Sequence, residues 1–502
     1  MKWFKVCMIC FVLVVAITGC KKFLDENSQS LQYADNWQRL QEVLVGDGYM
    51  PHLLPPFPTN SYKEKPDPSY MSWLNVMDDD IAENVTGPAF FDGRQDYFGM
   101  FTWQANPFVS YNYGFNNDDS WSKFYVNINA VNVIAQKAAD LKDNPEELKR
   151  IRGEALFLRA EYYFYMVNTY ALAYNRKTAS TDPGVPLKIT EYIEDKFFTR
   201  STVDSVYQQM VVDLKEAEGL LDGVQQTSIY HADVNAVNIL QSRVYLYMQD
   251  WQNAAVAADK VIARRAQLFN LAQYKPETSF FNSASPEAIF TQGGNSMIFT
   301  SPLQQQLKVL MPSPDLMGLY QPRDLRLKAF FEQGSNGIYR YTKVYRSNTV
   351  TPVEILSDSY FMRNAEAYLN KAEAAAMLDQ PAGANAALNT LRAARFLPAD
   401  FTPVNLSGVP LVNFIRDERR RELCFEGHRW FDLKRYAVNE KYPFTKKIVH
   451  TWSDGVVGGA VIRATLTLEP GDPDYLLPIP PPAILFNQGA LAPNPARQDR
   501  TF

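Results

Sequence analysis

Cysteine and histidine are scarce in this chain, and their scarcity argues against metal and thiol chemistry. The 502 residues include four cysteines and four histidines, and none of the histidines lies within helical reach of another. A Gly-rich phosphate loop, a His-Glu-x-x-His helix and a Gly-x-Ser-x-Gly elbow are also missing. The sequence therefore predicts no metal centre and no bound cofactor.

A basic excess is lacking too. The formal net charge is −5, so the chain has no excess of basic residues that could contact the phosphates of a nucleic acid. We therefore expect no nucleic-acid partner. Hydrophobic residues make up 46% of the chain and aromatic residues 13%, with 28 Tyr and 31 Phe. This composition predicts a large core, with some rings left to contact the apolar faces of a ligand such as a sugar.

The N-terminus has no apolar run long enough to span a bilayer. Lys2 and Lys5 begin a stretch whose apolar part, residues 6–17, has the length of a signal-peptide core. Ile-Thr-Gly-Cys then resembles a lipobox, in which a peptidase cuts before a cysteine that carries acyl chains. We expect residues 1–19 to be a lipoprotein signal peptide and Cys20 to be lipidated. The alternative is an ordinary secretory signal beside a chance cysteine. Two cysteines would be removed with residues 1–19, so Cys424 would be the one cysteine of the mature chain besides Cys20. We expect it to be a small apolar filler with no disulfide partner.

Proline and glycine divide the rest into helical and irregular parts. Residues 46–119 and 265–357 are irregular and hold scattered aromatics, whereas 120–264 and 358–436 have the pattern of helices joined by short links. The tail, 437–502, is rich in Pro and Gly. We expect helices over 37–45, 121–141, 145–170, 202–221, 234–248, 251–264, 359–378 and 382–396, strands over 288–292 and 339–345, and an extended 478–482. No linker is evident, so both irregular segments are expected to be excursions from one domain, 20–502.

Two carboxylates on the helical part of the segment NFIRDERRRELCFEGHRWFDLKRY, 413–436, fall on its apolar face. A helix that Gly427 stops would place Glu418 and Glu422 in line with the buried positions. A carboxylate that leaves water needs a cationic partner, and the same helix carries Arg416, Arg419, Arg420 and Arg421. We interpret it as an ion-paired core helix, followed by an aromatic turn at His428, Trp430 and Phe431 that packs back on it.

Paired carboxylates also have a catalytic interpretation. Glu418 with Glu422, or Glu422 with Glu426, could form the acid and base of a glycosidase. An acid/base pair needs one raised pKa, and the neighbouring arginines favour two ionised groups instead. The structural interpretation is preferred, and no enzyme activity is expected.

The stretch ERRRELCFEGHRWFDLKRY resembles the C-terminal signature of the SusD/RagB family of surface lipoproteins. CKKFLDENSQ from Cys20, YFMRNAEAYLNKAEAAAML from Tyr360 and YLLPIPPPAILFNQGALAPNP from Tyr475 resemble the family as well, in the family's order. The resemblance implies a mostly α fold, in which four tetratricopeptide-like helix pairs form a right-handed superhelical scaffold with loop-rich excursions and a few short strands. It also implies a lipid anchor in the outer membrane and a SusC-like TonB-dependent transporter as partner.

In the family, ligand residues come from the two irregular excursions. We predict contacts from Trp73, Trp103 and Tyr111 in the first and from Tyr320 and Arg323 in the second. Each could instead be a buried ring or a loop-pinning ion pair, such as Arg323 with Asp324. The run Asp78-Asp79-Asp80 lacks the spacing of a calcium loop. We expect it to cap a helix or to bond polar groups, ligand hydroxyls at Asp79 included.

These observations favour a surface lipoprotein that captures a nutrient, expected to be an oligosaccharide, and passes it to the transporter. Three alternatives stay open: a peptide ligand, a surface glycosidase, and a helical-repeat adaptor that binds only protein.

Overall fold

The structure is a computed structural model that describes residues 34–51, 70–84, 97–110, 114–115, 119–293, 310–334, 337–344, 356–453 and 462–500. Tyr111, and Cys20 with the predicted signal peptide, lie outside these ranges. The cleavage and lipidation of the N-terminus therefore stay predictions. Within the described residues, no helix is both long enough and apolar enough to cross a membrane.

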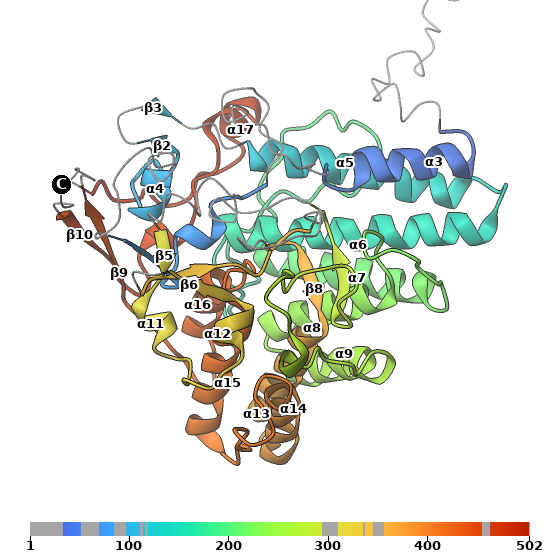
Figure 1. The fold of residues 1–502 in the computed structure, drawn as a ribbon. Coiled ribbons are helices and arrows are strands. Elements are labelled where there is room, and N and C mark those ends of the chain that lie inside the picture. Colours follow the sequence, from blue (N-terminus) through green and yellow to red (C-terminus); the bar gives the residue numbers. More distant parts are fainter. Residues whose placement is uncertain are drawn as a thin grey trace, which may run out of the picture.

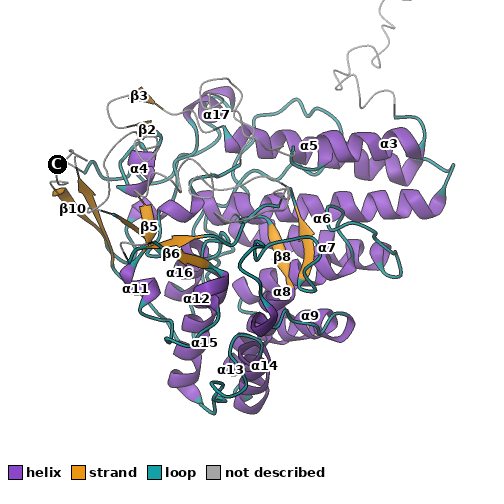
Figure 2. Ribbon diagram, in the orientation of Figure 1, coloured by secondary structure: helices purple, strands orange, loops and turns teal. Residues whose placement is uncertain are grey.

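Helices form the scaffold of the described chain (Figures 1 and 2). They are α5 Ser120–Asp140, α6 Pro145–Tyr170, α7 Val203–Leu221, α8 Val234–Tyr247, α9 Trp251–Arg264, α13 Asn364–Met377, α14 Pro381–Ala393, α15 Gly408–Leu423 and α16 Arg429–Ala437. From α5 to α9 each helix packs against the next, and α13 packs on α9, α14 and α15. Through these contacts the helices form one continuous scaffold.

Polar caps fix where several of these helices begin. Asn144 accepts a hydrogen bond from the backbone N–H of Glu147 at the start of α6, and Thr202 accepts one from Ser205 at 3.1 Å at the start of α7. Asp233 accepts from the backbone N–H of Ala236 at 2.9 Å at the start of α8. Each cap satisfies a backbone donor that has no partner inside the helix.

The shorter elements lie between or beside these helices. The short helices are α3 Trp37–Val43, α4 Phe98–Phe101, α11 Pro314–Met317, α12 Arg326–Ala329 and α17 Pro481–Phe486. The strands form two-stranded antiparallel pairs: β1 Ile81–Glu83 with β5 Leu310–Pro312, β2 Val109–Ser110 with β3 Gly114–Phe115, β4 Ala288–Thr291 with β8 Phe361–Arg363, β6 Phe331–Gln333 with β7 Tyr339–Tyr341, and β9 Ile448–Ser453 with β10 Ile462–Leu468. Figure 2 shows them as small patches against the helices.

Most of the predicted elements are confirmed to within a few residues, and the others are wrong in part. Trp430 and Phe431, expected in an aromatic turn, lie in the helix α16, and the strand expected over 339–345 ends at Tyr341. The helix expected over 359–378 begins at Asn364, because the preceding residues form β8 and pair with β4. The extended stretch expected over 478–482 gives way to α17 at Pro481, since proline is compatible with a first helical turn. The helix that Gly427 was expected to stop ends earlier, at Leu423.

Candidate functional site

The segment between α15 and α16 is the point where the loop-rich parts of the chain meet the helices. Phe425 and Gly427 both have positive φ, 61° and 77°, and turn the chain sharply from one helix to the other. The backbone N–H of Gly427 donates to Asn75 Oδ1 at 3.0 Å, and Asn75 Nδ2 donates to the carbonyl oxygen of Phe425 at 3.0 Å. A Cβ at Gly427 would come within 3.3 Å of Leu74, so this turn needs glycine.

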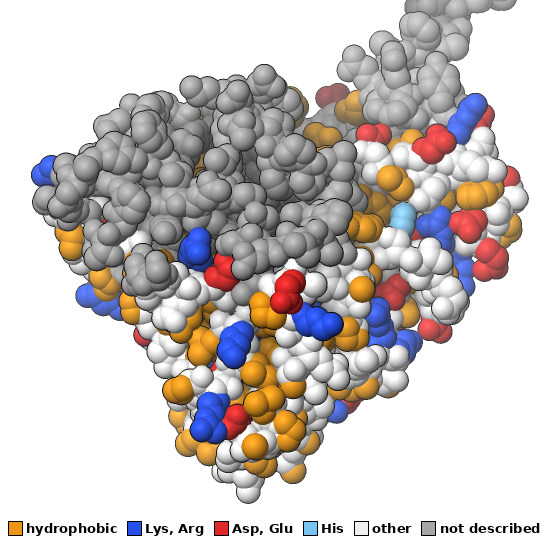
Figure 3. Space-filling view, viewed as in Figure 1, with side chains coloured by type: hydrophobic (Ala, Val, Ile, Leu, Met, Phe, Trp, Pro, Cys, Tyr) orange, Lys and Arg blue, Asp and Glu red, His pale blue; other side chains and the backbone are white. Residues whose placement is uncertain are grey.

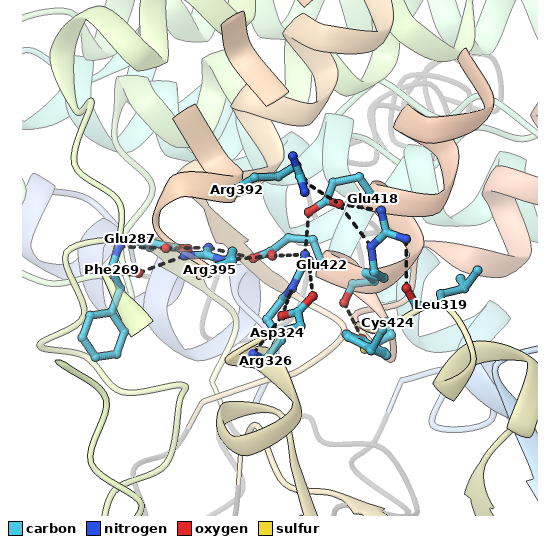
Figure 4. Close-up of polar contacts among 12 residues, drawn as sticks. Phe269, Glu287, Leu319, Asp324, Arg326, Arg392, Arg395, Glu418, Glu422 and Cys424 are labelled. Atoms are coloured by element: carbon cyan, nitrogen blue, oxygen red, sulfur yellow. Dashed lines mark hydrogen bonds and ion pairs between the residues drawn. The ribbon is translucent and has the colours of Figure 1, made fainter. Parts of the chain in front are cut away.

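Glu422 is surrounded by guanidinium groups (Figure 4). Arg395 donates to both of its carboxylate oxygens, at 2.7 and 2.9 Å, Arg363 donates to Oε1 at 2.6 Å, and Arg326 donates to Oε2 at 3.0 Å. The three arginines come from outside α15, on α14's C-terminal link, β8 and α12. Burial alone would raise the pKa of Glu422, but Arg395 and Arg363 hold it well below its ordinary value.

The two neighbouring glutamates are held in the same way. Glu418 accepts from Arg326 at 2.7 Å and from Arg421 at 2.6 Å, and these arginines lower its pKa to about 2 against the effect of burial. Glu426 accepts from the Lys343 ammonium at 2.6 Å and from Arg363 at 2.7 Å. The ion-paired interpretation of the helix is therefore confirmed. Its expected partners are corrected: of the arginines on α15, only Arg421 contacts these glutamates, because Glu422 and Glu426 are neutralised from other segments.

Arg420 and Arg429 reach instead to the first irregular segment. Arg429 Nε donates to Asp79 Oδ1 at 2.6 Å, and Arg420 Nε donates to Asp80 Oδ1 at 2.6 Å. Arg420 also donates to Asp315, at the start of α11, at 2.6 Å. The α15–α16 segment thus fixes residues of both irregular segments through charged hydrogen bonds, which are among the stronger polar contacts in proteins.

The two irregular segments also pair directly with each other. Strand β1 of the first pairs with β5 of the second, in the register Ile81 to Pro312. Next to this ladder Ser313 donates from its backbone N–H to the carbonyl oxygen of Asp80 and from its hydroxyl to that of Asp79, both at 2.7 Å. Two segments more than 200 residues apart in sequence are therefore joined to each other, and both are held by α15 and α16. We call this joined part of the two irregular segments the shared base.

Comparisons with known proteins match both halves of the chain to related families. Residues 316–495 match the model described as "SusD family", and residues 22–246 match the model described as "Starch-binding associating with outer membrane". The chain belongs to the SusD/RagB family. SusD proteins are associated with the outer-membrane surface and bind carbohydrate, and lipid anchoring is a property implied by the family.

Two curated relatives come from Formosa agariphila. "SusD-like protein P2" is 24% identical over 75% of this chain and 79% of its own length, and "SusD-like protein P38" is 26% identical over 63% and 71%. Among solved structures, a putative sugar-binding protein from Bacteroides vulgatus has a TM-score of 0.70 at 21% identity and covers 92% of this chain and 98% of its own. A "Laminarin binding SusD-like protein" has a TM-score of 0.58 at 20% identity, with 93% and 99% covered. The fold is therefore the mostly α, tetratricopeptide-like SusD fold, as expected.

Three rings predicted to contact ligand are buried in this SusD-like fold. Trp103 is fully buried: its indole N–H donates to the carbonyl oxygen of Met77 at 2.9 Å, and its ring stacks on His450 with centroids 4.4 Å apart. Tyr320 donates its hydroxyl to the carbonyl oxygen of Arg421 at 2.7 Å, and Trp73 is 4% exposed. The predicted ligand contacts are wrong for all three, and the alternative of a buried ring is confirmed, because these rings fill the shared base under the irregular segments.

Asp79 is buried as well, and its carboxylate is occupied by cations. Besides Arg429, it accepts from the Lys446 ammonium at 2.6 Å. Burial opposes ionisation, but Arg429 and Arg420 hold the pKa of Asp79 well below its ordinary value. The prediction that Asp79 bonds a ligand hydroxyl is therefore not supported. The expectation that the acidic run bonds polar groups of the protein is confirmed at Asp79 and Asp80.

Arg323 is exposed, with 76% of its side chain accessible, and pairs with Asp400 rather than with the neighbouring Asp324. Asp324 instead accepts from Arg326 at 2.7 and 2.9 Å. Arg323 is thus available to a ligand from the second irregular segment. The ligand contact predicted for it stays a prediction, as does that of Tyr111.

Half-buried rings on the described parts of the two segments were not singled out by sequence. Tyr97 and Phe108 lie in the first segment and Tyr339 in the second, each packed on the core with part of its ring accessible. The hydroxyls of Tyr97 and Ser72 lie 3.4 Å apart. Tyr339 is the first residue of β7, and its ring meets Phe331 edge-on with centroids 6.3 Å apart. These rings combine a fixed position with an accessible face, as stacking on a sugar requires.

Proposed function

We propose that this SusD-family protein captures an oligosaccharide with its two irregular segments and delivers it to a TonB-dependent transporter in the outer membrane, to which a lipid on Cys20 keeps it close. The observation that carries the proposal is the shared base: two segments far apart in sequence pair through β1 and β5 on a buried, ion-paired platform. A rigid scaffold that presents loop residues is a common arrangement for a binding site.

The same platform argues against hydrolysis by the signature glutamates. Glu418 and Glu422 are buried, hydrogen-bonded to arginines and held ionised, so neither can donate a proton to a glycosidic oxygen. We therefore propose a binding protein without enzyme activity.

Tyr97 and Tyr339 are the rings that we propose to stack on the sugar, with Arg323 available for its hydroxyls. The purified protein is titrated calorimetrically with oligosaccharides prepared from laminarin and from starch, beside a peptide library. We expect a glycan to bind, and Tyr339→Ala to weaken it about fivefold, which corresponds to the roughly 1 kcal/mol of an aromatic contact.

The matched control is Tyr442→Ala, which removes a half-buried ring that packs on the cluster of α13, α14 and α15 instead. Equal weakening by both substitutions would indicate a general loss of stability. Binding of peptides with no glycan bound would overturn the oligosaccharide as ligand.

A further inference from the structure

His450 on β9 is a buried histidine that holds part of the first irregular segment against the C-terminal tail. The residue is 2% exposed, and its ring lies between two aromatic rings of that segment. It stacks on Phe101 with centroids 4.2 Å apart and on Trp103 with centroids 4.4 Å apart, and the planes are within 13° and 20° of parallel. Figure 1 shows α4, which ends at Phe101, beside β9.

Both ring nitrogens of His450 face backbone carbonyl oxygens of the same segment. Nδ1 lies 2.7 Å from the carbonyl oxygen of Phe101, and Nε2 lies 2.9 Å from that of Asp78. A neutral imidazole has one N–H and can donate to only one of them, whereas an imidazolium can donate to both. The protonation state of this ring therefore changes how β9 holds the segment.

The acidic run beside the ring offers little compensation for a positive charge. Asp79 favours the imidazolium, but Arg429 and Lys446 already donate to its carboxylate, each at 2.6 Å. Burial raises the pKa values of Asp78 and Asp80, which opposes their ionisation. A charge on His450 would therefore have no carboxylate of this run to itself.

The other elements around the ring bring no further negative charge. Arg420 is bonded to the acidic run, and the Arg500 guanidinium of the tail lies over the Trp103 ring, 5.6 Å from its centroid. On β10 the residue paired with His450 is Leu466. Charged side chains of both signs lie on the surface drawn in Figure 3, where water solvates them, but water does not reach this ring. Burial outweighs the favourable contacts, and the pKa of His450 lies below its ordinary value.

Acidification therefore favours a state in which His450 has left the sandwich and is hydrated. A histidine in an open segment titrates near its ordinary pKa of about 6.5. The contribution of His450 to the closed state is fully present above that pH and is lost as pH falls through the lower folded value. Local opening of one segment can occur without unfolding of the whole chain.

From this geometry we infer that His450 is a pH-sensitive latch: the neutral ring holds residues 98–103 on β9, and its protonation releases them while the helical scaffold stays folded. Tyr97, which we proposed to stack on a sugar, directly precedes these residues. Release of bound oligosaccharide on acidification is the expected consequence, and that consequence rests on the proposed function.

The test of the latch uses the purified protein without any ligand. Amide hydrogen–deuterium exchange is measured at pH 7.5 and pH 5, with rates corrected for the intrinsic effect of pH. We expect the protection of residues 98–103 to fall by about fivefold or more on acidification, and residues 156–166 of α6 to keep theirs. In His450→Gln, which can donate one hydrogen bond but cannot ionise, this fall should be absent.

His231→Gln is the matched control, because His231 contacts Glu154 of α6 and lies outside the sandwich. It should leave the pH dependence of residues 98–103 unchanged. A second measurement on the wild type does not depend on either variant. Exchange of the imidazole Cε1 hydrogen, followed by mass spectrometry, gives the pKa of each histidine, and we expect that of His450 to lie below about 6.5.

A pKa of His450 at or above the ordinary value would overturn the latch, as would a fall in protection that persists in His450→Gln. Simultaneous loss of protection in α6 would overturn it too, since acid would then unfold the whole chain. No measurement here involves a ligand. Failure of the latch therefore leaves the proposed oligosaccharide binding standing, and absence of glycan binding leaves the latch standing.

Discussion

Two fully buried glutamates in this protein have opposite environments. Glu422 is bonded by three arginines, and its pKa lies well below the ordinary value. Glu161 on α6 is just as buried, but within the described part of the chain the donor bonded to it is the Gln292 amide at 2.7 Å, and burial raises its pKa to about 7. Burial alone therefore does not decide whether a carboxylate is charged; the cations that contact it also matter.

The largest expected effect comes from removing one cation of the Glu422 cluster. Arg363 bonds Glu422, Glu426 and Glu287, and Arg363→Met would leave buried charge without compensation. We expect the free energy of unfolding to fall by about 3–5 kcal/mol. Urea unfolding at neutral pH measures it, and a variant as stable as the wild type would contradict the view that these glutamates are charged.

Replacing Glu161 by a group that cannot ionise should raise the free energy of unfolding at high pH, whereas Arg363→Met should lower it. Its pKa is raised above the unfolded value, so its contribution to stability is fully present below about pH 4.5 and is lost as pH rises through about 7. Glu161→Gln keeps the shape and cannot ionise. We expect equal stability at pH 4, and a variant about 3 kcal/mol more stable than the wild type at pH 8.5. Urea unfolding at both pH values is the measurement, and a variant less stable at pH 8.5 would show that Glu161 is charged and paired.

Asp78 tests whether guanidinium groups that lie near a buried carboxylate, without contacting it, suffice to keep it ionised. Burial and the adjacent Asp80 and Asp79 raise its pKa, while Arg429 acts at a distance. Since a raised pKa means that stability is lost as pH rises through the folded value, Asp78→Asn should be more stable than the wild type at high pH, by about 1–2 kcal/mol. Thermal melting between pH 5 and 9 would detect it, and a pH-independent loss of stability would refute it.

The smallest effect is expected at the surface. Arg323→Met removes the ion pair with Asp400, but the arginine side chain is 76% exposed and water replaces the contact. We expect no measurable change in the free energy of unfolding. This variant is also the control for Arg363→Met, because the substitution is chemically the same. A loss comparable to that of Arg363→Met would remove the distinction between buried and exposed pairs.

The helices and the charged core were predictable because their determinants are local. Asn144-Pro145 and Thr202 mark helix starts by their own chemistry, and Glu418 and Glu422 fall on a buried face by spacing alone. The partners of Glu422 were not predictable from α15, because Arg326, Arg363 and Arg395 reach it from three other segments. Sequence proximity favoured the arginines on α15, whereas tertiary packing sends Arg419 to Asp432 and Arg420 to Asp80.

The ligand-contacting rings were harder to predict, because residue type does not reveal exposure. Trp73 and Trp103 were chosen as large aromatics in irregular segments, yet both lie in mostly apolar stretches, 70–77 and 98–103, that fold into the core. That context is a signal the sequence offers for burial. The accessibility of Tyr97 and Tyr339 depends on packing between distant segments and has no comparable signal.

Cys424, the one cysteine among the described residues, has a practical consequence for experiments on this protein. Its thiol is 1% exposed, lies 3.5 Å from the Tyr320 hydroxyl, and has a pKa raised by burial to about 11. A thiol that is both shielded and protonated reacts slowly with maleimides. In the processed protein with Cys20 acylated, as proposed above, a single cysteine placed at the exposed position 485 could therefore carry a fluorophore or a photo-crosslinker without first replacing Cys424, and contacts of α17 could be mapped on intact cells.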